Sequence, residues 1–455
     1  SIAGTAVLAL CLVAVSGSTL ATLRRADVAV TQNDVRTARG ESAPRLDPML
    51  ERQAQRLRAR LAKHEVMTPS IRTLVKALEA RRALLKQTIT LQVLPMGEMS
   101  VRPATATLSL VSHPDWITLD FSWTKARYGV DSGSVALFLE HDTDSALPLR
   151  RTATVSGMRE DHKGVMRAEV DSIAKAGFVL DPAKASLSLA NAFNENAQFV
   201  TLVGEYHAAT VKLAIDGNEQ DLTLLASGLS NFSKSPAARE ANAKKAIYEH
   251  VSNVIVEPGK TFAFNATLGG PVTNQAGWQD ALGLFGGGAA LTPGGGICQA
   301  ATTVYRAAML AGLPLVDWRA HSLYVSYYEQ YGVGVDATIF PGVQDLVFRN
   351  DTAGPLLLQA YTEGEDAIVN VFGIDDGREV SLEGPFFAGS KGRPSTLRAL
   401  GYEEIGWVRH ITYADGREEH KPFISRYAKP VPRSIAKKYE GVDGMSTLQA
   451  AAPTE

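Results

Sequence analysis

The stretch GGGICQAATTVYRAAMLAGLP, residues 294–314, places a cysteine behind three glycines at the start of a predicted helix. Small and apolar residues recur at helical spacing and predict a helix with one buried face: Ile297, Ala301, Val304, Ala308 and Ala311. Gly312 suits the left-handed position after a helix, and Pro314 prevents its continuation. The helix is therefore expected to begin at about Gly296–Ile297, with Cys298 in its first turn.

Two interpretations of Cys298 follow from this position. Unsatisfied backbone N–H groups and the helix dipole stabilise a thiolate there, and they lower a thiol pKa from about 8.5 into a range of roughly 3.5–7.5. Gly294, Gly295 and Gly296 carry no Cβ, so a substrate could approach the sulfur closely and their amides could bind an oxyanion. Alternatively, the glycines permit tight packing and the cysteine is a small apolar core residue.

A histidine and an acid downstream favour the nucleophile. In WRAHSLYVSYY (318–328) the alternate residues of a predicted strand put His321 on one face with apolar neighbours, towards the helix. A base within reach of the thiol would complete a Cys–His pair, although a lone histidine on an apolar face is also a common core residue. Asp336, expected on the next strand, is the candidate orienting acid. A structural role for Asp336 stays open, because its apolar neighbours alternate onto the opposite face of that predicted strand: Val333, Val335, Ala337 and Ile339. The order of the three residues is that of transglutaminase-like and papain-like hydrolases, as an analogy of arrangement.

Composition excludes several other classes. The chain has 455 residues, 45% of them apolar, and a formal net charge of −2, so nothing indicates nucleic-acid binding. Its two cysteines, Cys11 and Cys298, give no disulfide framework and no zinc-type spacing. We expect no cofactor and no metal site, because no further ligand clusters with Cys298 and His321.

The length indicates several domains. Residues 1–24 are expected to be a transmembrane anchor or a signal, because residues 2–23 are uncharged and long enough to span a bilayer; a buried core helix is the alternative. The expected protein is then bound to the cell membrane with extracytoplasmic domains, or secreted if the signal is cleaved. A linker (26–42) and two amphipathic helices, introduced by Asp47-Pro48 and Thr68-Pro69, fill residues 25–90.

Residues 91–226 are predicted to form a β-rich module of unassigned role, a spacer or a wall-polymer binder. Its expected strands are ATATLSLVS, WITLDFSW, GSVALFLE, FVTLVGEY and ATVKLAI. Residues 227–373 are expected to be an α+β domain in which the cysteine helix packs on an antiparallel β-meander. A β-hairpin around Ala414-Asp415-Gly416 is predicted within residues 374–433, and residues 434–455 are expected to be a disordered tail.

Residues 227–373 resemble the VanW domain, named for an accessory protein of vancomycin-resistance clusters. The resemblance is carried, in order, by SKSPAAREANAKKA, VIVEPGKTFAFNATLG, LTPGGGICQAATTVYRAAMLAGLPLV, AHSLYVSYY, DATIF and DLVFRNDTAGPLLLQAYTEGEDAIVNVFG. The hairpin at 407–430 is similar to a tail that often follows this domain. The chain departs from the family in GLFGGGAALTPGGG, where a more polar loop is usual.

The resemblance implies a bacterial envelope protein, and some members are regarded as cysteine L,D-transpeptidases that cross-link peptidoglycan stem peptides. It makes Cys298 the nucleophile, His321 the base and Asp336 the orienting acid. The candidate oxyanion or substrate-binding residues are Gly294, Gly295, Gly296, Gln299, Asn265 and Ser322, while Arg239 and Asn242 match family positions without an assigned role.

The sequence therefore predicts a cell-envelope cysteine acyl-transferase that acts on peptidoglycan stem peptides, or a related peptidase. The alternative is a non-catalytic envelope module that binds wall polymer or a partner protein and is linked to glycopeptide resistance.

Overall fold

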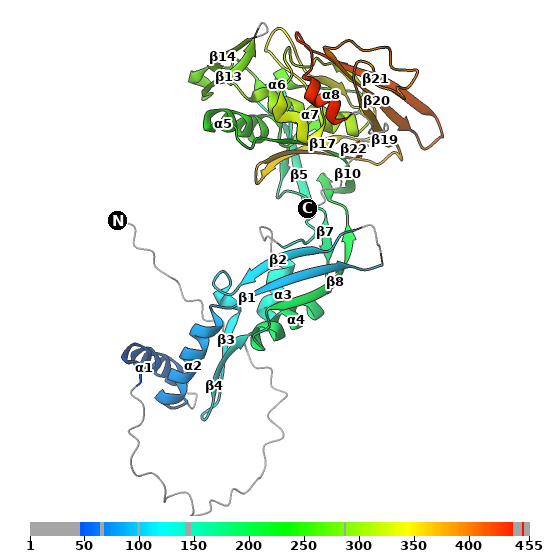
Figure 1. Cartoon of the computed structure of the whole chain (residues 1–455). Helices are drawn as coiled ribbons and strands as arrows, with labels where there is room; N and C mark the ends of the chain where they lie inside the picture. Colours follow the sequence, from blue (N-terminus) through cyan, green and yellow to red (C-terminus); the bar gives the residue numbers. More distant parts are fainter. Residues whose placement is uncertain are drawn as a thin grey trace, which may run out of the picture. The chain divides into compact units, whose positions relative to one another are not determined.

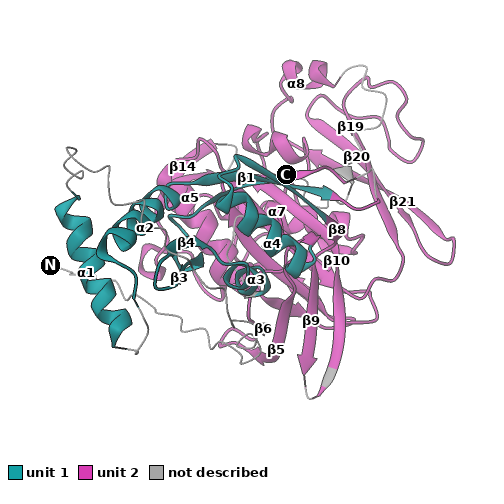
Figure 2. Ribbon diagram, turned by 90° about the horizontal axis from the view of Figure 1, so that it is seen from below, with its two compact units in different colours: residues 1–94, 105–147, 180–203 teal, residues 95–104, 148–179, 204–455 magenta. Residues whose placement is uncertain are grey.

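A computed structural model of the chain describes residues 46–63, 68–97, 101–141, 147–215, 217–285, 288–439 and 448–449 (Figure 1). The expected membrane segment, residues 2–23, and the linker, residues 26–42, lie outside the described residues. Among the helices that are described, none is both long and apolar enough to cross a bilayer. The structure is mixed α+β, as expected, and it divides into two compact units (Figure 2).

The first unit comprises residues 1–94, 105–147 and 180–203. Its helices are α1 (Pro48–Ala62), α2 (Ile71–Leu84), the 3-10 turn η1 (Pro114–Trp116), α3 (Ser132–His141) and α4 (Pro182–Asn194). Strands β2 (Ala104–Ser109), β1 (Thr88–Pro95) and β8 (Phe199–His207) lie side by side in that order, and β3 (Ile117–Phe121) pairs with β4 (Ala126–Val130).

The two expected amphipathic helices are present, but the predicted starting residue of the second one is wrong. Asp47 caps α1 by accepting the Met49 N–H at 2.8 Å, and Pro48 is the first helical residue, as predicted. The cap of α2 is Ser70, which accepts the Thr73 N–H at 3.1 Å, so that helix begins after the expected Thr68-Pro69 signal.

One expected strand, GSVALFLE, is instead the helix α3. The carboxylate of Asp131 accepts hydrogen bonds from the backbone N–H of Ser134 at 2.8 Å and from its hydroxyl at 3.0 Å. This cap satisfies the free N–H groups of a helix start and decides between helix and strand for a short apolar run.

The second unit, residues 95–104, 148–179 and 204–455, is built on a closed barrel. Around it follow β10 (Asn218–Asn231), β18 (Asp366–Gly373), β17 (Leu356–Glu363), β11 (Val254–Val256), β6 (Met166–Val170), β5 (Ala153–Glu160) and β9 (Thr210–Ile215). Neighbours are antiparallel except β5 and β9, which are parallel. The expected border at 226/227 falls inside β10, so the predicted β-rich module and the domain that follows it share this barrel.

The cysteine-bearing helix α7 (Ile297–Leu310) packs on the antiparallel strands β10 and β18. In place of the expected meander of consecutive strands, these two belong to the closed barrel and are neighbours although they are far apart in sequence. Gly228 of β10 allows this approach: a Cβ there would lie 2.1 Å from the carbonyl oxygen of Thr303 and 2.5 Å from the nitrogen of Ala307. Both faces of α7 are covered, so the single buried stripe predicted for it understates its burial.

Shorter elements complete the second unit. They are α5 (Ala237–Lys245), which continues into the π-helical turn η2 (Ala246–Val251), α6 (Phe264–Leu268), and the 3-10 turns η3 (Asn274–Ala276) and η4 (Ser326–Tyr331). β12 (Thr261–Ala263), β16 (Val347–Arg349) and β15 (Leu315–Asp317) form a sheet in that order, and β13 (Asp280–Phe285) pairs with β14 (Gly288–Pro293). β7 (Gly177–Val179) pairs with the end of β8.

The predicted C-terminal hairpin is confirmed as β20 (Glu404–Thr412) and β21 (Glu418–Arg426), with Gly416 at a φ of 80° in the turn. It belongs to a larger sheet of order β21–β20–β19–β22, with β19 (Glu379–Phe386) and β22 (Leu448–Gln449). Ile405, Trp407 and Phe423 share one hydrophobic core with α7, so this sheet is part of the domain core. Within the expected disordered tail, the structure describes α8 (Arg433–Lys438) and β22.

Candidate functional site

The nucleophile candidate lies where the sequence placed it. Gly296, with a φ of 110°, precedes α7, and Cys298 is its second residue. The other end also follows the prediction: Gly312 is left-handed with a φ of 71°, and the Leu313 N–H donates to the Ala308 carbonyl at 3.0 Å.

Cys298 is the one residue of α7 that is not buried. The other residues of the helix, on every side, are enclosed by the barrel, the C-terminal sheet and the loops between them. The sulfur is therefore half-buried at the N-terminus of a helix that is otherwise sealed from solvent.

The three glycines serve packing. A Cβ on Gly294 would lie 2.2 Å from Cγ1 of Val272, one on Gly295 2.3 Å from the Ala281 carbonyl oxygen, and one on Gly296 2.6 Å from the Arg239 carbonyl oxygen. The space that their missing side chains leave is filled by the chain itself. The expectation that a substrate backbone enters there does not fit this geometry.

Helix α5 holds the glycine turn. The Asn242 side chain donates to the carbonyls of Gln279 at 2.8 Å and Gly295 at 2.9 Å, and it accepts the Gln279 N–H at 2.9 Å. Arg239 donates to Oε1 of Gln299 at 2.7 Å. These contacts give Arg239 and Asn242, which had no assigned role, the function of fixing the residues on both sides of Cys298.

His321 and Asp336 do not lie on strands, contrary to the alternation argument. Both belong to irregular segments, and the residues after His321 lead into η4. The buried guanidinium of Arg306, on α7, fixes the chain between them: it donates to the carbonyls of Tyr328 at 2.7 Å, Gly332 at 3.1 Å and Val335 at 2.8 Å.

The predicted His–Asp contact is present. Nδ1 of His321 lies 2.6 Å from Oδ2 of Asp336, and the backbone N–H of His321 donates to the same oxygen at 2.9 Å. Both residues are buried, with exposed fractions of 4% and 3%. Because a carboxylate only accepts, the Nδ1 proton is directed at Asp336 and Nε2 is left for another partner.

Charge in the site is arranged as in a thiolate–imidazolium pair. Burial disfavours the thiolate, yet His321, as hydrogen-bond partner and as positive charge, lowers the pKa of Cys298. Burial likewise opposes the imidazolium, but Tyr328, Asp336 and Cys298 together raise the pKa of His321 well above its usual value. The pKa of Asp336 is lowered, since its bonds to His321 outweigh its desolvation.

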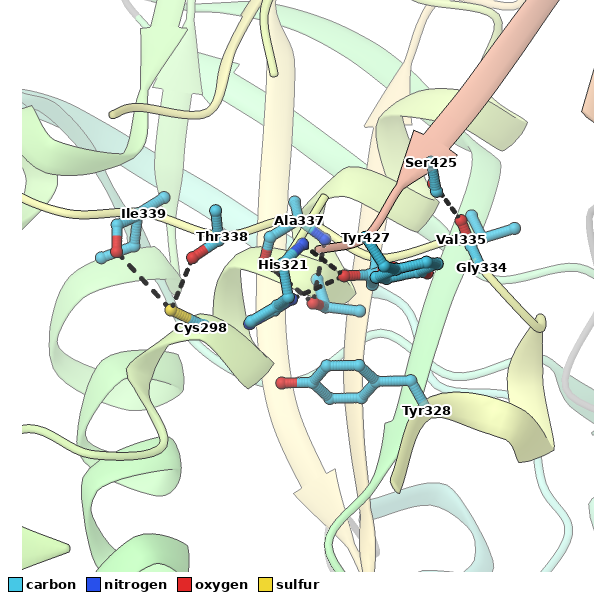
Figure 3. Close-up of polar contacts among 12 residues, drawn as sticks. Cys298, His321, Tyr328, Gly334, Val335, Ala337, Thr338, Ile339, Ser425 and Tyr427 are labelled. Atoms are coloured by element: carbon cyan, nitrogen blue, oxygen red, sulfur yellow. Dashed lines mark hydrogen bonds and ion pairs between the residues drawn. The ribbon is translucent and has the colours of Figure 1, made fainter. Parts of the chain in front are cut away.

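Two further groups touch the sulfur. The Thr338 hydroxyl and the Ile339 carbonyl each lie 3.6 Å from Sγ (Figure 3). The N–H groups of Gly294 and Gly295 donate to the carbonyls of Gln279 at 3.0 Å and Thr292 at 3.3 Å, so neither is free to bind an oxyanion.

The other candidate residues are placed away from this chemistry. Gln299 is fully buried and bonded to Arg239 and to Ser230. Asn265 anchors α6 by donating to the Gln344 carbonyl at 2.9 Å. Ser322 is exposed next to His321, and its carbonyl accepts the Ala428 N–H at 2.7 Å. In the described part of the chain, no group of three or more His, Cys, Asp or Glu residues could hold a metal ion.

Comparison with known proteins agrees with the resemblance noted in the sequence. Residues 238–372, which include Cys298, His321 and Asp336, match the family model described as VanW like protein. The chain therefore contains a VanW-like domain at these residues. Over 147 residues it is 33% identical to the "Uncharacterized protein YoaR" of Bacillus subtilis (strain 168), across 32% of this chain and 46% of that protein. It thus spans about half the length of the curated relative that it matches. No solved structure matches it.

The VanW-like domain of this chain also depends on residues that the sequence did not single out. The Tyr427 hydroxyl donates to Oδ1 of Asp336 at 2.8 Å, and the Trp318 indole N–H donates to the Asp336 carbonyl at 2.9 Å. Tyr427 is 91 residues from Asp336 in sequence and beyond the matched range. Sequence spacing carries no signal for such a contact, and only the hairpin before Tyr427 was predictable.

Replacing Asn242 by alanine in the VanW-like domain is expected to lower the free energy of unfolding by about 2–3 kcal/mol, because it leaves the buried carbonyl of Gly295 and the N–H of Gln279 unpaired. Chemical denaturation measures the loss. The exposed Asn191→Ala, on α4, is the control. Equal midpoints for the two variants would contradict the role of Asn242.

Proposed function

We propose that the VanW-like domain is a cysteine acyl-transferase of the cell envelope. The observation that carries this proposal is that Cys298 is the one residue of α7 that is not fully buried, and that His321 of a buried His–Asp pair lowers the pKa of its thiol. A structural cysteine would be expected on one of the sealed faces of the helix.

The reaction follows from the geometry. The Cys298 thiolate attacks a peptide carbonyl, and the tetrahedral oxyanion is stabilised by backbone N–H groups at the N-terminus of α7. Collapse breaks the C–N bond, the His321 imidazolium gives its proton to the departing amine, and a thioester remains. An acceptor amine then attacks the thioester, His321 takes its proton, and the thiolate leaves. If water is the acceptor, the site is a peptidase.

We propose peptidoglycan stem peptides as the substrate, with L,D-transpeptidase-like chemistry, on the strength of the VanW resemblance. The same resemblance, together with the uncharged residues 2–23, supports a protein anchored in the cell membrane with its domains on the outer side. The thioester route uses side chains and backbone amides alone.

The direct test is incubation of the purified protein with disaccharide-peptides, followed by mass spectrometry of the protein and of the products. The expected results are a peptide adduct on Cys298 and a cross-linked product when an acceptor stem is present. A folded protein that binds wall fragments but forms neither adduct nor product would favour the non-catalytic module.

His321→Gln is expected to slow alkylation of Cys298 at pH 7 at least about tenfold. Without the imidazolium the thiol returns towards an ordinary pKa of about 8.5, and only a few per cent is thiolate at pH 7. Iodoacetamide labelling followed by peptide mass analysis measures the rate. The exposed His162→Gln serves as control. An unchanged labelling rate in a folded His321→Gln protein would show that His321 does not act as the base for Cys298.

A further inference from the structure

The acid and the base of the site lie on segments without regular secondary structure. His321 precedes η4, and Asp336 follows a turn at residues 333–334. Neither segment has a β-ladder or helical hydrogen bonds to hold it. Reacting groups need to be fixed within a fraction of an ångström, so other parts of the chain must supply the support.

The β20–β21 hairpin supplies contacts to both segments. On the Asp336 side, Trp407 Nε1 donates to the Val333 carbonyl at 2.8 Å and the Ser425 hydroxyl donates to the Gly334 carbonyl at 2.6 Å. On the His321 side, the Ala428 N–H donates to the Ser322 carbonyl at 2.7 Å. Figure 3 shows β21 arriving at this loop with Ser425 and Tyr427.

Tyr427 completes this set of contacts at the carboxylate itself. Its side chain is buried, packs edge-on against Tyr324 with ring centroids 5.6 Å apart, and donates to Oδ1 of Asp336. Oδ2 is already taken by the backbone N–H and the Nδ1 of His321. The carboxylate is thus held from both ends, and among the described residues Tyr427 is the one that donates to Oδ1.

We infer that Tyr427 is a positioning residue for the Asp336–His321 pair, and that the β20–β21 hairpin is part of the reactive unit although it lies outside the residues matched by the VanW model. The inference rests on the proposed function for its chemical meaning. Tyr427 acts through Asp336, which orients the imidazole, which in turn stabilises the thiolate. The hydroxyl stays a donor because burial and the neighbouring Asp336 raise the pKa of Tyr427 well above its usual value.

The test is Tyr427→Phe, which keeps the ring and removes one hydroxyl. Alkylation of Cys298 is expected to slow several-fold at pH 6.5, where the thiolate depends on an oriented imidazolium. It should match the wild type at pH 9.5, where the thiol ionises without help. A defect that vanishes at high pH is a signature of altered ionisation, since a general loss of structure would change labelling at both values. Tyr402→Phe, at a tyrosine that is 76% exposed, is the matched control.

A second readout does not need the thiol. In the wild type, the Nδ1 proton of His321, held against Asp336 and buried, is expected to give a downfield NMR signal that exchanges slowly with water. In Tyr427→Phe this signal should broaden or move upfield, and in Tyr402→Phe it should not. Ser425→Ala, which releases the Gly334 carbonyl, is expected to act in the same direction and covers the case in which Tyr427→Phe does not fold.

The outcomes separate the two proposals. If wild-type Cys298 titrates as an ordinary thiol, the proposed function fails. Suppose instead that the wild type shows a low thiol pKa, and that the folded Tyr427→Phe protein, or Ser425→Ala in its place, shows the same pH profile and the same imidazole signal. The positioning role of the hairpin is then overturned, while the proposed function stands.

Discussion

Cys298→Ser is expected to abolish acyl transfer, with a loss of at least about a thousandfold in kcat/KM. A serine hydroxyl is not ionised by an imidazolium at neutral pH, so the nucleophile is lost while the shape of the site is kept. Stability should hardly change, because the sulfur is half-buried and its two contacts at 3.6 Å are weak. Initial rates on disaccharide-peptides, with thermal melting of the same samples, measure both effects.

The matched control for that variant is Cys11→Ser, at the other cysteine of the chain. We expect it to keep wild-type turnover, since the proposed chemistry uses one sulfur. A Cys298→Ser protein that retains a tenth of the wild-type rate would show that the bond is broken elsewhere in the molecule.

Gly228→Ala is expected to have the largest effect on folding, a loss on the order of 3 kcal/mol or more in the free energy of unfolding. The new methyl group would overlap the Thr303 carbonyl and the Ala307 nitrogen, both in the backbone of α7, so relief requires a shift of the helix away from β10. Such a shift would also move Cys298 relative to His321. Urea unfolding and Cys298 labelling should therefore change together.

Gly270→Ala is the control for that substitution, because a Cβ at Gly270 meets no atom within 4 Å. An unfolding midpoint for Gly228→Ala as high as that of Gly270→Ala would mean that α7 does not sit against the barrel at this distance.

Local signals predicted the parts of this fold that depend on neighbours in sequence. The left-handed Gly312 and the glycine before Ile297 set both ends of α7, and Asp47-Pro48 started α1. Where a remote group decides, the same reasoning failed. The alternating pattern around His321 suggests a strand, but the chain there is irregular and leads into η4, where the carbonyls of Tyr328 and Gly332 accept hydrogen bonds from Arg306 of α7.

The candidate site also has a part that the sequence predicts and a part that it does not. Residue type and order along the chain predict Cys298, His321 and Asp336 as one candidate site, and the structure places the three residues together. The roles of the glycines and of Tyr427 could not be predicted from the sequence. The role of the glycines depends on which atoms fill the space beside their backbone, and that of Tyr427 depends on a contact with Asp336, 91 residues away in sequence.

The central claim is that Cys298 is a thiolate at neutral pH, paired with a protonated His321. The pH dependence of iodoacetamide labelling of Cys298, in the Cys11→Ser background, tests it most directly. The pKa of Cys298 is lowered and that of His321 is raised, so the ion pair is expected from the pKa of the thiol up to that of the imidazole, and the labelling rate should reach its plateau at a lower pH than that of an ordinary thiol. A rate that climbs through pH 8.5 without an earlier plateau, or a thiol that stays unlabelled at every pH in the folded protein, would contradict the account.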